Sequence, residues 1–168
     1  MPWSTEDPRP ADPVLGDPAS VAALAAVLHR CAADLRLALH RLPPASVGTS
    51  RRHASRVRAL HAQARTVITS MERAGELLAE HAVVLAEATG LGRRLVDRAG
   101  ALGLSVDGPV VARSRGVRGV ADATTEQDRA AALERLQHVL DTILADLEVR
   151  RRELRADLVS GPGRRTSR

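Results

Sequence analysis

The chain has 168 residues, a net charge of +5 and a single aromatic residue, Trp3. This composition excludes a core built on aromatic packing and a stacking platform for single-stranded nucleic acid, because such platforms need several flat rings. Since Cys31 is the one cysteine, neither an internal disulfide nor a thiolate zinc cluster can form. The sequence has no apolar run of the roughly 18 residues that a membrane span needs, and it does not open with a signal-peptide pattern. We expect a cytoplasmic chain without a cleaved export signal.

The positive charge is carried by arginine alone, because the chain has no lysine. It is concentrated in residues 43–58, 103–120 and 160–168, which carry +4, +2 and +3, whereas the long segments between them are nearly neutral or acidic. A protein that binds nucleic acid usually lines up its cations along one helix face or groove. Nucleic acid is therefore the less favoured partner, and an Arg-rich nucleic-acid-associated or regulatory helical protein is the alternative interpretation.

The first predicted element follows an irregular, proline-rich lead-in over residues 1–16. Asp17 and Pro18 are typical of a helix start, because the carboxylate accepts free backbone N–H groups and proline gives up an amide without a partner. Apolar residues then repeat at steps of three and four until Pro43-Pro44. The pattern predicts a helix over residues 18–42 whose apolar stripe consists of Val21, Leu24, Leu28, Cys31, Leu35, Ala38 and Leu42.

A second stripe predicts a longer helix over about residues 50–89. Gly90 and Gly92 leave open whether this helix kinks before residues 93–102 continue it. The two helices together form a predicted hairpin over residues 17–102. The second stripe consists of Val57, Leu60, Ala64, Val67 with Ile68, Met71, Ala74, Leu78, Ala82, Leu85 and Ala88.

A Gly/Arg-rich link over residues 103–123 precedes the third predicted helix. Asp107-Gly108 is a turn signal that permits a small hairpin, but we favour a flexible loop. The third helix occupies residues 124–160 and packs on the hairpin, and a basic disordered tail fills residues 161–168. Its stripe consists of Leu133, Leu136, Leu140, Ile143, Leu144, Leu147, Leu154 and Leu158. The predicted fold is all-α, an antiparallel hairpin of two long helices plus a long C-terminal helix in a three-helix bundle.

No pattern of catalytic or metal-binding residues stands out along the chain. The six histidines lack the spacing of zinc proteases, and Glu72, Glu76 and Glu80 are better explained as a solvated ridge on a helix. No serine or cysteine has a base at a motif spacing. We therefore expect no enzyme and no cofactor. The cationic residues Arg150, Arg151, Arg152 and Arg155 complement a helix dipole, and a docking patch for an acidic partner or a membrane surface is the alternative.

Several stretches resemble the WXG-type helical-hairpin family of type VII (ESX) secretion, especially actinobacterial WXG-like domains. GDPASVAALAAVLHRCAADLRLALHRL is similar to the opening helix of that family, and SVGTSRRHASRVRALHAQA is similar to its turn and second helix. LLAEHAVVLAEA resembles the end of the second helix, and GLSVDGPVV with RLQHVLDTILADLEVRRRELRADL resembles the segment after the hairpin in longer members. The resemblance covers about residues 16–159 and implies a helical adaptor that forms dimers.

The two family motifs are degenerate in this chain. Ser46 stands where the family turn has tryptophan, while Gly48 matches the family glycine. His81 and Leu85 stand at the tyrosine and acid of the export motif, and Glu87 is the nearest acid after them. The resemblance implies a non-catalytic partner protein, cytoplasmic or exported by type VII secretion. We expect it to bind itself or a related small helical protein, with orientation set by Arg51, Arg52, Arg56 and Arg58.

Overall fold

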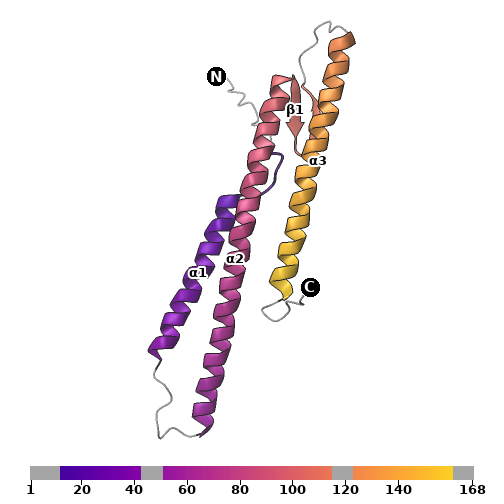
Figure 1. Ribbon diagram of the computed structural model, residues 1–168. Helices are drawn as coiled ribbons and strands as arrows, with labels where there is room; N and C mark the ends of the chain where they lie inside the picture. The colour runs from indigo at the N-terminus through magenta and orange to yellow at the C-terminus, as the bar shows by residue number, and fades with distance from the viewer. Residues whose placement is uncertain (1–11, 43–50, 115–122, 161–168) are drawn as a thin grey trace, which may run out of the picture. The chain divides into compact units, whose positions relative to one another are not determined.

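The computed structural model describes residues 12–42, 51–114 and 123–160. It is all-α, with two long helices followed by a long C-terminal helix, as expected (Figure 1). The helices and strands are α1 (Pro18–Arg41), α2 (Arg51–Ala101), β1 (Leu104–Asp107), β2 (Val110–Arg113) and α3 (Ala123–Ser160). No helix in the described ranges is long and apolar enough to cross a bilayer.

The chain divides into two compact units, which are described separately. One consists of Met1–Asp17 and Val84–Arg150, and the other of Pro18–Val83 and Arg151–Arg168. Helix α2 is continuous from Arg51 to Ala101, so Gly90 and Gly92 do not interrupt it.

In the unit that contains α1, this helix lies antiparallel to the first part of α2 (Figure 1). Four of the seven residues in the predicted α1 stripe are exposed, so that part of the prediction was wrong. Val21, Leu28 and Leu35 are half-buried as expected, but Leu24 and Cys31 are exposed. The row that packs on α2, which we call the α1 seam, consists of Val21, Ala25, Leu28, Ala32, Leu35 and Leu39.

The facing row of α2 keeps most of its predicted members. Leu60 and Val67 are exposed, and His61 and Gly75 take part in their place. This row, the α2 seam, consists of Ala54, Val57, His61, Ala64, Ile68, Met71, Gly75, Leu78 and Ala82. It advances in alternating steps of three and four residues, as packed helices require.

Small residues allow the two seams to approach closely. A β-carbon on Gly75 would overlap the ring of His29 and lie 3.3 Å from the carbonyl oxygen of Ala25. Ala25 and Ala32 are the two buried residues of α1. The seam of α1 therefore follows its small side chains rather than its larger exposed leucines.

The other unit has its core between the end of α2, the strands and α3 (Figure 1). Residues 104–113 form an antiparallel hairpin, so the favoured prediction of a flexible loop was wrong there, and residues 115–122 lie outside the described ranges. Gly108 adopts a φ of 53° in the turn, a conformation that side chains rarely allow. The core consists of Leu95, Ala99, Leu104, Val106, Val111, Leu136 and Leu140.

The predicted stripe of α3 is confirmed over most of its length. Leu136, Leu140, Ile143 and Leu147 are buried, whereas Leu158, near the C-terminal end of α3, is exposed. The described part of the lead-in is irregular, as expected, but it packs on α2. A β-carbon on Gly92 would lie 3.1 Å from both Pro13 Cγ and Val14 Cγ2.

Candidate functional site

The hairpin of α1 and α2 carries different chemistry on the two sides of its seams. Successive residues of a helix point about 100° apart, so the residues just before and just after a seam position lie on opposite flanks. In an antiparallel hairpin, the two preceding rows share one face and the two following rows share the other. About half of the preceding residues are apolar, whereas the following ones include three arginines and two glutamates.

We call the first face the apolar flank. Its large members are strongly exposed, with Leu24 at 51%, Leu60 at 63% and Val67 at 44% of their full accessibility. Cys31, a free cysteine, is exposed on the same row. The apolar flank consists of Leu24, Cys31, Ala38 and Leu42 from the α1 side and Leu60 and Val67 from α2.

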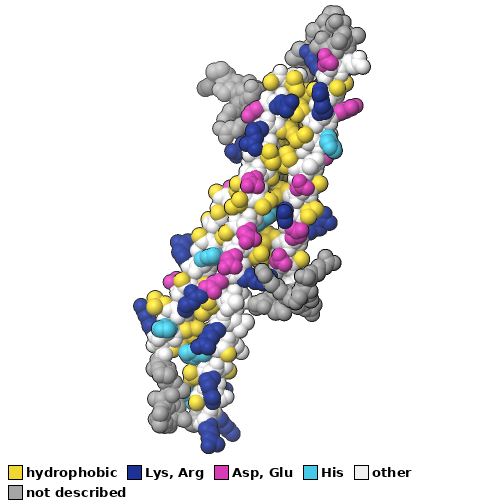
Figure 2. Space-filling model, viewed as in Figure 1, with side chains coloured by type: hydrophobic (Ala, Val, Ile, Leu, Met, Phe, Trp, Pro, Cys, Tyr) yellow, Lys and Arg dark blue, Asp and Glu magenta, His cyan; other side chains and the backbone are white. Residues whose placement is uncertain are grey.

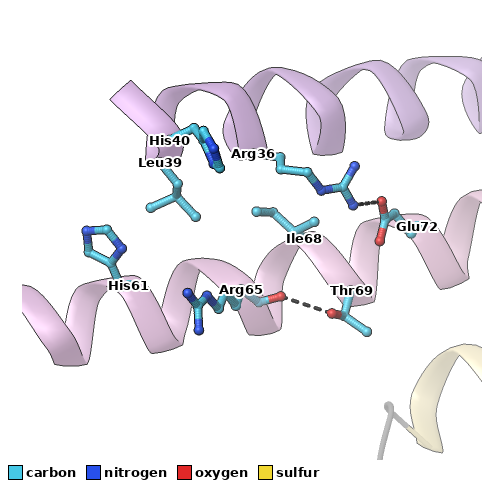
Figure 3. Close-up of a pocket in the computed structure, with 8 residues that line it drawn as sticks. All are labelled: Arg36, Leu39, His40, His61, Arg65, Ile68, Thr69 and Glu72. Atoms are coloured by element: carbon cyan, nitrogen blue, oxygen red, sulfur yellow. Dashed lines mark hydrogen bonds and ion pairs between the residues drawn. The ribbon is translucent and has the colours of Figure 1, made fainter. Parts of the chain in front are cut away.

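The opposite face contains a groove of about 480 Å³ between the two helices (Figure 3). Leu39 and Ile68 lie between the helices, and charged and polar side chains surround them. The groove is lined by Arg36, Leu39 and His40 of α1 and by His61, Arg65, Ile68, Thr69 and Glu72 of α2. The lining thus combines apolar side chains with two arginines and one glutamate.

An ion pair joins the two helices at one end of this groove. The guanidinium of Arg36 donates to Glu72 Oε1 (Figure 3). Both side chains are more than a third exposed, so the pair contributes only about 0–1 kcal/mol to stability. Thr69 donates its hydroxyl to the carbonyl oxygen of Arg65 at 3.1 Å, within α2. The guanidinium of Arg65 has no ion-pair partner in the part of the chain that the structure describes.

His61 brings a buried polar atom into the groove wall. Its Nε2 is inaccessible to water and has no hydrogen-bond partner among the described residues. A buried polar atom without a partner costs about 1–3 kcal/mol, so a ligand or a rearrangement that supplies one would be stabilising. Within the described ranges, no three His, Cys, Asp or Glu side chains gather as a metal site.

The four predicted docking arginines after the turn lie in the first turns of α2. Arg51 and Arg58 continue with Arg65 at seven-residue spacing, so these three share one line along the basic side of the helix. We call them the arginine row. Arg52 and Arg56 point to another side of α2. Neither Arg65 nor Arg36 was predicted from the sequence, although the seven-residue spacing from Arg51 is a usable signal for Arg65.

The positions of the degenerate family motifs are only partly described. Ser46 and Gly48 lie outside the described residues. Leu85 is buried, His81 is half-buried and Glu87 is exposed. Burial, and then the charge of Arg151, lower the pKa of His81 below its ordinary value of 6.5.

The cationic group of α3 does not form one uniform exposed patch. Arg150, Arg152 and Arg155 are exposed, whereas Arg151 is half-buried. Arg151 lies close enough to His81 to affect its titration. At least this arginine therefore has a neighbour within its own unit.

Comparisons with protein-family models, with curated proteins and with solved structures found no match to this chain.

Proposed function

We propose that this chain is a non-catalytic helical interaction module that binds a second copy of itself or a related small helical protein through the apolar flank. The observation that carries the proposal is the second apolar row on α1 and α2, which the hairpin itself leaves exposed. Leu24, Leu60 and Val67 keep about half of their surface in water. Apolar side chains aligned on a helix at seven-residue spacing are the usual contact surface between helices.

The size of this surface sets the strength of the expected complex. Full burial of a large aliphatic side chain contributes about 1.5–3 kcal/mol, and about half of the surface of each of these side chains is already buried by the chain itself. Each would therefore add roughly 1 kcal/mol on association, against several kcal/mol of lost translational and rotational freedom. Small neighbours such as Ala38 help by letting a partner helix approach closely. We expect a weak self-complex and tighter binding to a partner that covers more of the flank.

We further propose that the module works in type VII secretion, in the cytoplasm or as an exported protein. Support comes from the resemblance of residues 16–159 to WXG-like domains and from the helical hairpin that α1 and α2 form. Leu85, which stands at the acid of the export motif, is buried and so is not open to a partner. We therefore expect a partner that binds the helical hairpin rather than an exposed export motif. Secretion genes beside the gene for this chain would support the setting.

Light scattering after size exclusion, over a range of protein concentrations, tests the association. We expect a concentration-dependent dimer that Val67→Glu abolishes. Val83→Glu is the control, because Val83 is another exposed valine of α2, at 59% against 44% for Val67, and it lies off the apolar flank. A chain that remains monomeric, alone and when co-expressed with the helical proteins encoded beside it, would overturn the proposal. So would equal effects of the two variants.

A further inference from the structure

The positive charge of the chain is concentrated at one end of the α1–α2 hairpin. Residues 30–65 contain eight arginines and one acid, Asp34, which gives +7, whereas the whole chain carries +5. The remainder is therefore slightly acidic. On the face shown in Figure 2, arginine and histidine side chains cover the first turns of α2 without acidic neighbours. A surface with this charge favours an anionic partner.

The cations form a line that is longer than the groove. The arginine row extends from Arg51 to Arg65, which are 14 residue steps or about 21 Å apart at 1.5 Å per residue. The row ends before Glu72, which is paired with Arg36 of α1. A small anion would use one part of this line. A helix with acids at the same seven-residue spacing would pair with all three arginines of the row.

The groove beside the arginine row favours a helix over nucleic acid. Leu39 and Ile68 lie in the groove between the two helices, and a phosphate backbone offers no apolar side chain to contact them. The chain also lacks the aromatic rings that stack on bases, apart from Trp3. An amphipathic helix brings both kinds of side chain, with apolar residues in the groove and acids along its edge.

We propose that the groove and the arginine row together form a docking site for an acidic amphipathic helix of a partner protein. Carboxylates one heptad apart pair with Arg51, Arg58 and Arg65, and apolar side chains of the same helix fill the groove over Leu39 and Ile68. The site lies on the face opposite the apolar flank, so the chain can hold two helices at once. This inference rests on the proposed function as an interaction module and names a second partner surface for it.

Fluorescence anisotropy with the full chain tests the site. The probe is a labelled synthetic helix of about three heptads, with leucines on one face and glutamates at seven-residue spacing beside them. We expect saturable binding at about 50 mM salt that weakens as salt rises, since the contacts are screened charges. A second probe with glutamine in place of glutamate should bind about tenfold more weakly. Equal binding of the two probes, or no binding at low salt, would overturn the proposal.

Two double variants locate the binding. Arg58→Glu with Arg65→Glu should weaken binding of the acidic probe by about tenfold or more. Arg52→Glu with Arg56→Glu changes the charge of α2 by the same amount but off the arginine row, and it should have less than about a threefold effect. Circular dichroism verifies that both variants keep their helix content. Equal losses in the two variants would contradict a localised site.

Two further measurements distinguish this docking site from a nucleic-acid surface and from self-association. A duplex DNA of about 20 base pairs that binds more tightly than the acidic probe, and that loses binding to the same variant, would identify a nucleic-acid surface instead. Light scattering on the same samples reports self-association through the apolar flank. If the chain is monomeric but binds the acidic helix, the proposed self-association fails and the docking site stands. If it dimerises without binding the probe, the docking site fails alone.

Discussion

The side-chain amide of Gln137 fastens the β-hairpin to α3 by accepting a hydrogen bond from the backbone N–H of Val111 at 2.7 Å. Its Nε2 donates to the carbonyl oxygen of Pro109 at 2.9 Å and to Asp141 Oδ1 at 2.8 Å. One side chain thus satisfies backbone groups at the turn and at the second strand. Val111 is itself part of the buried core.

Replacement of Gln137 by methionine should destabilise the unit that contains the hairpin. The backbone N–H of Val111 is partly buried and would lose its partner, which costs about 1–2 kcal/mol. Urea unfolding followed by circular dichroism measures the change. Gln63→Met is the control, because Gln63 is exposed on α2. Equal stabilities of the two variants would contradict the assigned role.

The glycines of α2 should respond differently to alanine. A β-carbon on Gly90 would meet only the end of the Arg94 side chain, at 3.8 Å, so Gly90→Ala should stabilise the helix by about 0.5–1 kcal/mol. At Gly92 the same change pushes against Pro13 and Val14. We expect Gly92→Ala to be about 1 kcal/mol less stable than Gly90→Ala. Thermal unfolding compares them, and identical midpoints would show that the segment before α1 does not pack there.

Leu140 should be among the most sensitive core positions. It is fully buried between the β-hairpin and the end of α2. Leu140→Ala should therefore lower the free energy of unfolding by about 2–5 kcal/mol through lost contacts and a cavity. Leu158→Ala, at an exposed position of the same helix, should cost less than about 1 kcal/mol. Denaturant titration gives both values. A small effect at Leu140 would mean that α3 does not pack on the β-hairpin as described.

The pKa of His81 predicts a dependence of stability on pH. Because the folded pKa lies below 6.5, the unfolded chain binds more protons in the window between the two values. The contribution is therefore fully present above pH 6.5 and is lost as pH falls through the folded pKa. His81→Gln should flatten the pH dependence of the unfolding midpoint in this window. An unchanged slope would contradict the lowered pKa.

The two causes of that shift can be separated by NMR titration of the His81 ring. Removal of the charge in Arg151→Gln should raise the pKa of His81, but leave it below 6.5, because burial is the larger cause. A pKa at or above 6.5 in this variant would mean that the arginine, not burial, dominates.

Which elements are helices could be predicted from the sequence, but which side of α1 packs on α2 could not. Leu24 and Cys31 lie on one apolar row and Ala25 and Ala32 on the next, and periodicity alone fits both. In the structure the alanine row packs on α2, where Gly75 lies close to the backbone of Ala25. The distance at which two helices pack depends on the side chains of both. It cannot be seen in either stripe alone.

The β-hairpin and the groove show the same limit of prediction from the sequence. The turn signal at Asp107-Gly108 is visible in the sequence, but the hydrogen bonds that hold the β-hairpin to α3 come from Gln137, far along the chain. The arginines near the start of α2 are also visible, but from the sequence alone they are simply charges after a turn. Their seven-residue spacing with Arg65 is also visible in the sequence, but the groove beside them depends on how α1 and α2 pack. Contacts between segments far apart in the sequence are the features that local patterns specify least well.

The alternation of seam, apolar flank and basic row also restricts how this hairpin can change its length during evolution. An insertion of one residue in the middle of α1 would rotate every later position by about 100°, so that Arg36 and His40 would turn out of the row that borders the groove. An insertion of seven residues would shift the rows by only about 20°. Homologous hairpins should therefore differ in length by whole heptads, with compensating heptads in both helices.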